Sequence, residues 1–147
     1  MTPFDRQAFR FTLTLSVRDY ECDFQGIVNH AVYLHYLEHT RHEFAKTIGL
    51  DVIELARRHV NIVVVRAEID YKASLRSGDT FVVALNVEPL SRVRIAFDQE
   101  IHRRETDSQE ESEPQPRTTL ILQARMIATA VNENGRPFLP PELERFR

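Results

Sequence analysis

The sequence predicts an α+β domain in which one long helix covers one face of a mainly antiparallel sheet of about five strands. The chain has 147 residues, a length typical of one domain. Of these, 42% are hydrophobic and 28% are charged, so a chain of this size can form a buried core. One long segment, residues 30–48, has apolar residues at helical spacing, and the segments before and after it alternate with a period of two. We therefore expect residues 1–147 to form a single domain.

Five segments share the period of two that places apolar side chains on one face of a strand. They are residues 9–17, 61–71, 80–88, 92–102 and 118–131. In the first segment, the apolar residues that share one face are Phe9, Phe11, Leu13, Leu15 and Val17. Turn signals at residues 77–79 and 134–135 support these boundaries. We expect a loose start over residues 1–8 and a stiff, proline-rich tail over residues 137–141.

The long helix is expected to begin after Asn29 and to end before Gly49. The Asn29 side chain can accept a hydrogen bond from an early helical N–H group, and Gly49 can adopt the left-handed conformation that closes a helix. The apolar stripe that should face the sheet contains Tyr33, Leu37, Phe44 and Ile48. A second, shorter helix is expected over residues 51–58, with Asp51 near its start.

The composition argues against several classes of partner and location. The net charge of -3 disfavours nucleic-acid binding, which requires a concentrated positive field. No apolar run is long enough to span a bilayer and the N-terminal residues lack the apolar stretch of a secretory signal, so we expect a cytoplasmic protein. The one cysteine, Cys22, excludes an intrachain disulfide and is expected to be a small packed residue. The acidic residues 105–117 predict an exposed, flexible loop.

The residues that lead into the long helix contain the strongest candidate for chemistry. Asp23 lies seven residues before His30, and Gly26 permits the chain to fold back between them. If Asn29 caps the helix, the backbone N–H of His30 stays free to face a ligand oxygen at the positive end of the helix dipole. A carboxylate beside such a site could attack a thioester or deprotonate water. On spacing alone, an aspartate that only closes a turn is the favoured interpretation.

The pattern from Asp23 to Glu38, D-x-x-G-x-V-N-H-x-x-Y-x-x-x-x-E, resembles the 4-hydroxybenzoyl-CoA thioesterase branch of the hotdog superfamily. It is similar to bacterial acyl-CoA thioesterases and plant acyl-acyl carrier protein (acyl-ACP) thioesterases, and residues 71–82 also match that group. The resemblance implies a hotdog fold, which is a curved antiparallel sheet wrapped around the long helix. It also implies active sites at the interface of a homodimer, and dimers that often pair into homotetramers.

The resemblance further implies hydrolysis of acyl-CoA or acyl-ACP thioesters to a free acid and a thiol, with no cofactor or metal. The implied catalytic residues are Asp23, His30 and Asn29. Asp23 would be the general base or the nucleophile, and the N–H of His30 would polarise the thioester carbonyl. The implied substrate-binding residues are Gly26, Tyr33 and Glu38. Tyr33 can instead be a core residue, and Glu38 can instead form a surface ion pair.

Several alternatives are left open by the sequence. A hotdog domain could bind acyl thioesters without hydrolysing them, or it could be a dehydratase, whose chemistry usually relies on a histidine-bearing loop. A zinc site could use His35, His39 and His42 on one helix face, although Lys46 stands where a histidine would complete an H-E-x-x-H motif. The acyl length and the choice between CoA and ACP are also left open.

Overall fold

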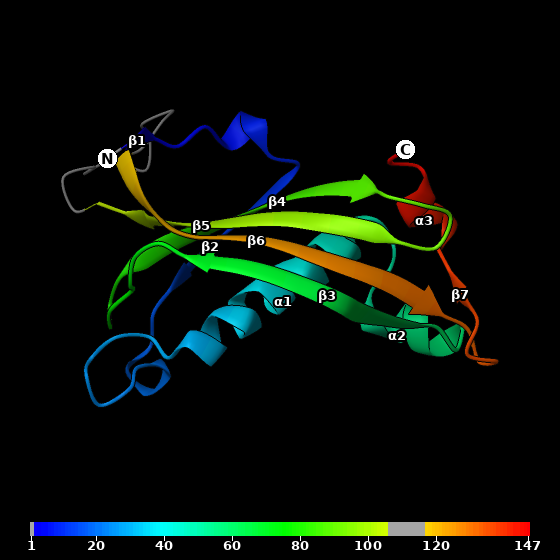
Figure 1. The fold of residues 1–147 in the computed structure, drawn as a ribbon, viewed down its shortest axis with the longest axis horizontal. Helices are drawn as coiled ribbons and strands as arrows, with labels where there is room; N and C mark the ends of the chain where they lie inside the picture. Colours follow the sequence, from blue (N-terminus) through cyan, green and yellow to red (C-terminus); the bar gives the residue numbers. More distant parts are fainter. Residues whose placement is uncertain (1, 106–116) are drawn as a thin grey trace.

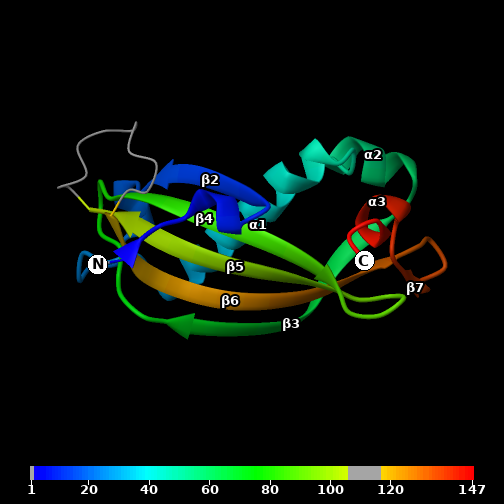
Figure 2. The ribbon, with the colours of Figure 1, turned by 90° about the horizontal axis from the view of Figure 1, so that it is seen from above.

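The computed structural model describes residues 2–105 and 117–147, and it contains one long helix against a curved sheet (Figures 1 and 2). The strands are β1 (Thr2–Pro3), β2 (Phe11–Ser16), β3 (Asn61–Tyr71), β4 (Thr80–Pro89), β5 (Ile95–Arg104), β6 (Arg117–Val131) and β7 (Pro137–Phe138). The helices are α1 (His30–Thr47), α2 (Val52–Arg57) and α3 (Pro141–Glu144), with short 3₁₀ turns η1 (Arg6–Ala8) and η2 (Asp19–Glu21).

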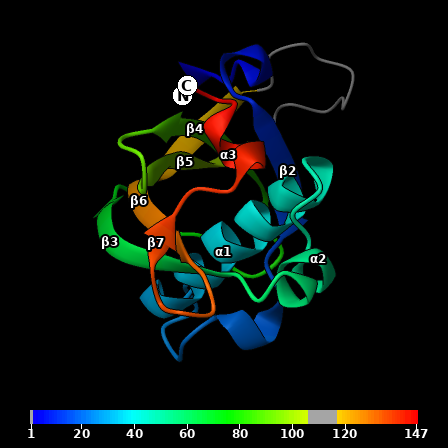
Figure 3. The same cartoon turned by 90° about the vertical axis from the view of Figure 1, so that its right-hand side faces the viewer.

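Every strand pair in the sheet is antiparallel, and the long strands follow the order β3-β6-β5-β4-β2. The two-residue strands β1 and β7 pair with the two ends of β6. Seen from its end, the sheet curves around α1 from β3 to β2 (Figure 3). The predicted α+β class, with long strands on one long helix, is therefore confirmed.

Local sequence signals set the helix boundaries. Gly49 has a φ of 83°, the left-handed conformation predicted for the residue that closes α1. The Asp51 carboxylate accepts a hydrogen bond of 2.8 Å from the Glu54 N–H and caps α2. The strand predicted from residue 92 begins instead at Ile95, because the Leu90 N–H donates to the Arg94 carbonyl and closes a turn there.

The core lies between α1 and the concave face of the sheet. The buried residues of α1 are Tyr33, Tyr36, Leu37, Thr40 and Phe44, which share one face of the helix. Leu37 has no exposed surface, and neither have Phe81 of β4 and Ile101 of β5. The ring of Tyr36 lies 4.7 Å from that of Phe81. Each such aliphatic or aromatic side chain contributes about 1.5–3 kcal/mol through its burial.

The expectation of a loose N-terminal start is wrong. Phe4 is only 2% exposed and stacks on Phe9, with ring centroids 5.7 Å apart. Together with Val82 and Ala84 they form a second buried cluster. The N-terminal segment therefore crosses the convex face of the sheet near β4 and β5 (Figure 1), and Phe9 belongs to this outer cluster, away from the core face predicted for it.

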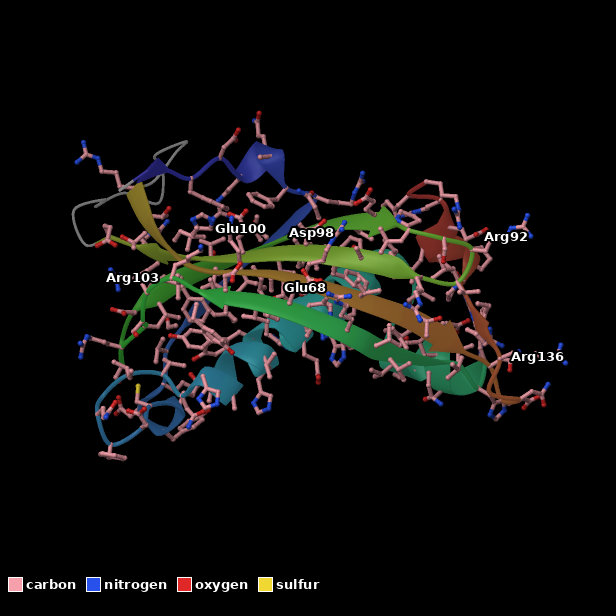
Figure 4. The ribbon with its side chains drawn as sticks, viewed as in Figure 1. Glu68, Arg92, Asp98, Glu100, Arg103 and Arg136 are labelled. Carbon is pink, nitrogen blue, oxygen red and sulfur yellow. The ribbon has the colours of Figure 1, made fainter. Side chains whose placement is uncertain are left out.

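The rest of the convex face is polar. Figure 4 shows Glu68, Asp98 and Glu100 on the face of the sheet that points away from α1. Arg125 of β6 lies among these acids and donates to Asp98 at 3.0 Å and to Glu88 at 2.7 Å. Alternation along each strand thus separates a polar outer face from the apolar face that packs on α1.

The C-terminal tail forms β7 and α3, two short elements that the sequence did not predict within the expected stiff tail. Leu139 and Leu143 are buried against the core cluster. Arg58, just after α2, forms an ion pair of 2.7 Å with Glu142 of α3 and ties the tail to the short helix. Most of the predicted acidic loop, residues 106–116, lies outside the described residues. No helix in the described part of the chain has the length and apolarity needed to cross a membrane.

Replacing Leu37 with alanine should lower the free energy of unfolding by about 2–5 kcal/mol, because the change leaves a cavity between α1 and the sheet. Leu34 is on the same helix but 38% exposed, so Leu34→Ala should change stability by only about 0.5 kcal/mol. Urea unfolding at one protein concentration measures both effects. Equal losses in the two variants would contradict the assignment of Leu37 to the core.

Candidate active site

The loop before α1 folds back on itself as a tight hairpin. Cys22 and Val28 form an isolated antiparallel bridge, and the Asp23 N–H donates to the Ile27 carbonyl at 2.9 Å. The Gly26 N–H donates back to the Asp23 carbonyl at 3.0 Å. Gly26 has a φ of 82°, which a residue with a side chain adopts only under strain, so the turn depends on glycine at this position.

The Asp23 carboxylate is held by this turn through one of its oxygens. Asp23 Oδ1 accepts the Gln25 N–H at 2.9 Å and the Ile27 N–H at 3.4 Å. Asp23 Oδ2 has no partner among the groups that the structure describes. The turn-closing interpretation of Asp23 is therefore correct, and it leaves the second oxygen of a partly exposed carboxylate available to a ligand.

The start of α1 has one open N–H donor. Asn29 Oδ1 accepts the Ala31 N–H at 2.9 Å, and the Asn29 carbonyl accepts the Val32 N–H at 2.9 Å. The His30 N–H has no acceptor within residues 2–105 and 117–147. The predicted cap at Asn29 is confirmed, and the open donor lies at the positive end of the helix dipole.

Glu21 ties the loop to the body of α1, and the sequence pattern did not reveal this role. The Tyr36 hydroxyl donates to Glu21 Oε1 at 2.9 Å, and the Glu21 carbonyl accepts the Asn29 N–H at 3.2 Å. Burial, assisted by the hydrogen bond to Glu21, raises the pKa of Tyr36 well above its ordinary value. Glu21 and Tyr36 are 15 residues apart in the sequence, so no local motif marks the pair.

Tyr33 is a core residue that contacts Leu75 and Tyr71 next to the start of α1. It is 3% exposed, and its hydroxyl accepts the Leu75 N–H at 2.9 Å. Burial raises the pKa of Tyr33. Its ring lies 5.7 Å from that of Tyr71, whose hydroxyl donates to the His30 carbonyl at 3.2 Å. The core interpretation of Tyr33 is confirmed, and Tyr71 connects the end of β3 with the start of α1.

A cavity of about 560 Å³ lies between α1, α2 and β3. Glu38 lies at its edge with an exposed side chain, and within the described residues it forms no ion pair. Arg41 also lines the cavity and donates to Gln99 Oε1 at 3.0 Å. Sequence reasoning did not single out Arg41 or Gln99.

The three histidines weighed as a zinc site lie on α1, and one of them, His42, lines the cavity. His35, His39 and His42 are exposed on α1. In the described ranges, no three His, Cys, Asp or Glu side chains converge as a metal site would require. Cys22 is a free, partly buried thiol that packs against the core, as expected for a small apolar residue.

A model of the thioesterase superfamily matches residues 25–109. The chain belongs to the thioesterase superfamily. The match includes Gly26, Asn29 and His30, and it begins two residues after Asp23. The family predicted from the motif is therefore confirmed, while the catalytic role of Asp23 stays a prediction.

Two relatives in sequence are similar over only part of their length. A chloroplastic acyl-acyl carrier protein thioesterase of Arabidopsis thaliana is 37% identical over 133 residues, which are 90% of this chain and 64% of the relative. A putative esterase of Aquifex aeolicus is 38% identical over 81 residues, which are 55% of this chain and 63% of the relative. The chain thus spans less than two thirds of the length of these proteins.

Solved structures show the same fold along nearly the whole chain. A hypothetical protein of Aquifex aeolicus has a TM-score of 0.77 and 29% identity, and the match covers 93% of this chain and 99% of that one. A mutant 4-hydroxybenzoyl-CoA thioesterase, solved with 4-hydroxybenzoyl-CoA, has a TM-score of 0.79 and covers 92% and 96% of the two chains. Its 14% identity supports the fold alone. The hotdog fold is confirmed.

Asn29→Ala should lower the free energy of unfolding by about 1 kcal/mol, because the Ala31 N–H loses its acceptor. Asn29→Asp retains a cap oxygen and should unfold at nearly the wild-type urea concentration. Urea midpoints of the three proteins compare them directly. An alanine variant as stable as the aspartate variant would show that the cap contributes nothing.

Proposed function

We propose that the protein hydrolyses acyl-CoA or acyl-ACP thioesters to a free acid and a thiol. The observation that carries the proposal is the presence of two open groups in the segment that leads into α1. One is a carboxylate fixed through Oδ1 with Oδ2 open, and the other is a helix N-terminus with an open N–H donor. Thioester hydrolysis requires a base or nucleophile and a donor for the carbonyl oxygen, and these groups meet both needs.

The open His30 N–H and the helix dipole stabilise the negative charge that develops on the thioester carbonyl oxygen. In the general-base route, Asp23 takes a proton from water, whose oxygen bonds to the carbonyl carbon. The carbon–sulfur bond then breaks, and the leaving thiolate takes up a proton. In the nucleophilic route, an Asp23 oxygen bonds to the carbonyl carbon, and the carbon–sulfur bond breaks to release the thiolate. Water then hydrolyses the resulting anhydride to the free acid and the Asp23 carboxylate. Both routes use the same two groups.

The neighbouring residues have supporting roles in this proposal. Gly26 keeps the hairpin free of a side chain where a substrate would approach Asp23. Tyr33 fixes the segment after β3 beneath the site, and Glu38 lies at the edge of the cavity where it can meet an acyl chain. The Arabidopsis relative is named an acyl-ACP thioesterase, which supports this substrate class. A cytoplasmic location stays a prediction.

Asp23→Asn should abolish thioester hydrolysis, with a loss of about 100-fold or more in kcat. Asparagine retains an oxygen that can accept the Gln25 N–H, so the loop should keep its conformation while losing the base. Release of free thiol from acyl-CoA and acyl-ACP measures the rate. Glu133→Gln, a matched change in an exposed hairpin, should leave the rate unchanged.

Measurements on a folded Asp23→Asn protein and on the wild-type protein separate the proposed thioesterase from a binding domain and from a dehydratase. Retained thiol release would remove Asp23 from the mechanism. An absence of thiol release from the wild-type protein, together with tight binding of acyl-CoA, would favour a non-catalytic binding domain. Hydration of an enoyl thioester without thiol release would favour a dehydratase.

We also propose that two protomers pair through β3 as a homodimer, from which a dimer of dimers can form. One edge of β3 pairs with β6, and no described strand covers the long opposite edge. Val63, Val64 and Val65 lie on β3 with 39%, 42% and 45% of their surface exposed. An uncovered apolar edge strand favours pairing with another chain. Tyr71 links β3 to His30, so this pairing would place the site beside the interface.

Val65→Lys should reduce the mass in solution to that of a monomer, because a buried lysine in the paired edge would lose hydration without a partner. Ile53→Lys introduces the same side chain at an α2 position that is already 77% exposed, and it should not alter the mass. Light scattering at micromolar concentration distinguishes monomer, dimer and tetramer. A wild-type protein with the mass of a monomer would contradict the proposed pairing.

A further inference from the structure

Arg41 is an unusual residue for the buried side of a helix. Its side chain reaches the interface between α1 and the sheet, where it donates to Gln99 Oε1 at 3.0 Å. Gln99 is only 1% exposed and faces α1 from β5, and its Nε2 donates to the Leu37 carbonyl at 3.1 Å. Phe97 and Ile101, which flank Gln99 on the same face of β5, are buried apolar residues. A polar chain therefore extends from the core to Arg41.

The charge of Arg41 is not neutralised within the described part of the protein. Burial lowers the pKa of the Arg41 guanidinium. The charge of Glu38, which is too far away to form an ion pair, raises the pKa by a smaller amount. The group stays charged nonetheless, and its planar fork offers five N–H donors, of which one meets Gln99. Burying a cation without an anion costs free energy. A ligand that supplies an acceptor to the Arg41 guanidinium offsets this cost.

The cavity beside Arg41 is otherwise mainly apolar. Its apolar lining includes Phe44, Ile48, Leu50, Leu55, Ile62 and Phe97. Its other polar lining residues are Glu38, His42, Asn61 and Lys46, and Lys46 is already paired with Glu43. The volume of about 560 Å³ lies within the range of small-molecule sites, which combine apolar walls with a few polar groups that fix orientation. A ligand that suits this lining has an apolar body and one oxygen acceptor.

We propose that this cavity is the acyl pocket of the thioesterase and that Arg41, held by Gln99, selects acyl groups with an oxygen acceptor far from the thioester. A carboxylate binds the guanidinium fork most strongly, and a hydroxyl binds it less strongly. The proposal rests on the proposed function, because it assigns the thioester carbonyl to the start of α1. It goes beyond that function by naming the chemistry of the far end of the substrate.

The geometry of α1 sets the length of acyl group that reaches Arg41. Arg41 follows His30 by eleven residues, which is about 16 Å along a helix. Each bond of an extended chain advances somewhat less than the C–C bond length of about 1.5 Å, so a chain of roughly a dozen carbons spans this distance. The matched probes are therefore dodecanoyl-CoA, ω-hydroxydodecanoyl-CoA and the mono-CoA thioester of dodecanedioic acid.

The first experiment measures kcat/KM for these three thioesters. The wild-type protein should prefer the ω-carboxyl substrate over dodecanoyl-CoA by about 10- to 100-fold, as expected for a hydrogen-bonded charged group. Arg41→Met, which has a similar length without the charge, should reduce this ratio to near one, and Arg41→Lys should give an intermediate ratio because it lacks the fork. Arg136→Met, a matched change in the exposed hairpin before β7, should keep the wild-type ratio. A wild-type ratio near one, or a ratio unaffected by Arg41→Met, would overturn the proposal.

The second experiment separates binding from hydrolysis. Calorimetry with the Asp23→Asn protein compares two esters that differ only at the far end of the chain, methyl dodecanoate and the monomethyl ester of dodecanedioic acid. The ester with the ω-carboxylate should bind more tightly, and this preference should disappear in the double variant Asp23→Asn, Arg41→Met. If the preference depends on Arg41 while the wild-type protein releases no thiol, the pocket is supported and the proposed function fails. Equal affinities for the two esters, with or without Arg41, would overturn the pocket assignment.

Discussion

The packing of α1 against the concave face of the sheet is the interaction on which the rest of the structure depends. Leu37 and Phe81 have no exposed surface, and Tyr36 and Phe81 pack ring against ring. A close-packed interface of this kind resists rotation of the helix about its axis. It therefore fixes the direction of the His30 N–H at one end of α1 and the position of Arg41 further along.

The hairpin before α1 shows how one residue can have a structural and a chemical role together. Asp23 closes its turn through Oδ1, and that bond restrains the rotation of the carboxylate. Glu21 and Tyr36 hold the same hairpin against the helix. The interpretation of Asp23 as a turn residue and its interpretation as a catalytic residue therefore do not compete, because they use different oxygens of one carboxylate. Preorganised groups of this kind lose little entropy when a substrate binds.

The elements predicted correctly from the sequence are those specified by local signals. Asn29, Gly49 and Asp51 define helix ends through bonds or conformations within a few residues, and the strand predicted over residues 61–71 has the bounds of β3. The features that the sequence did not predict are contacts between distant segments. Phe4 meets Val82 and Ala84 across the convex face, and residues 137–144 add to β6 and the core, although neither segment has a long periodic pattern. Gln99 lies 58 residues after Arg41, so only the folded chain shows that they interact.

Different parts of α1 carry the two proposed roles, which are hydrolysis of the thioester and selection of the acyl group. The groups assigned to the thioester lie before and at the helix start, whereas Arg41 lies three turns further along and belongs to a different set of contacts. Substitutions more than about 7–10 Å apart without shared partners are nearly additive in free energy. The far end of the pocket can therefore change its preferred acyl group through Arg41 and Gln99 while the Asp23 hairpin stays intact. In a fold whose helix is fixed by its core, this separation would permit the proposed reaction to serve different acyl chains.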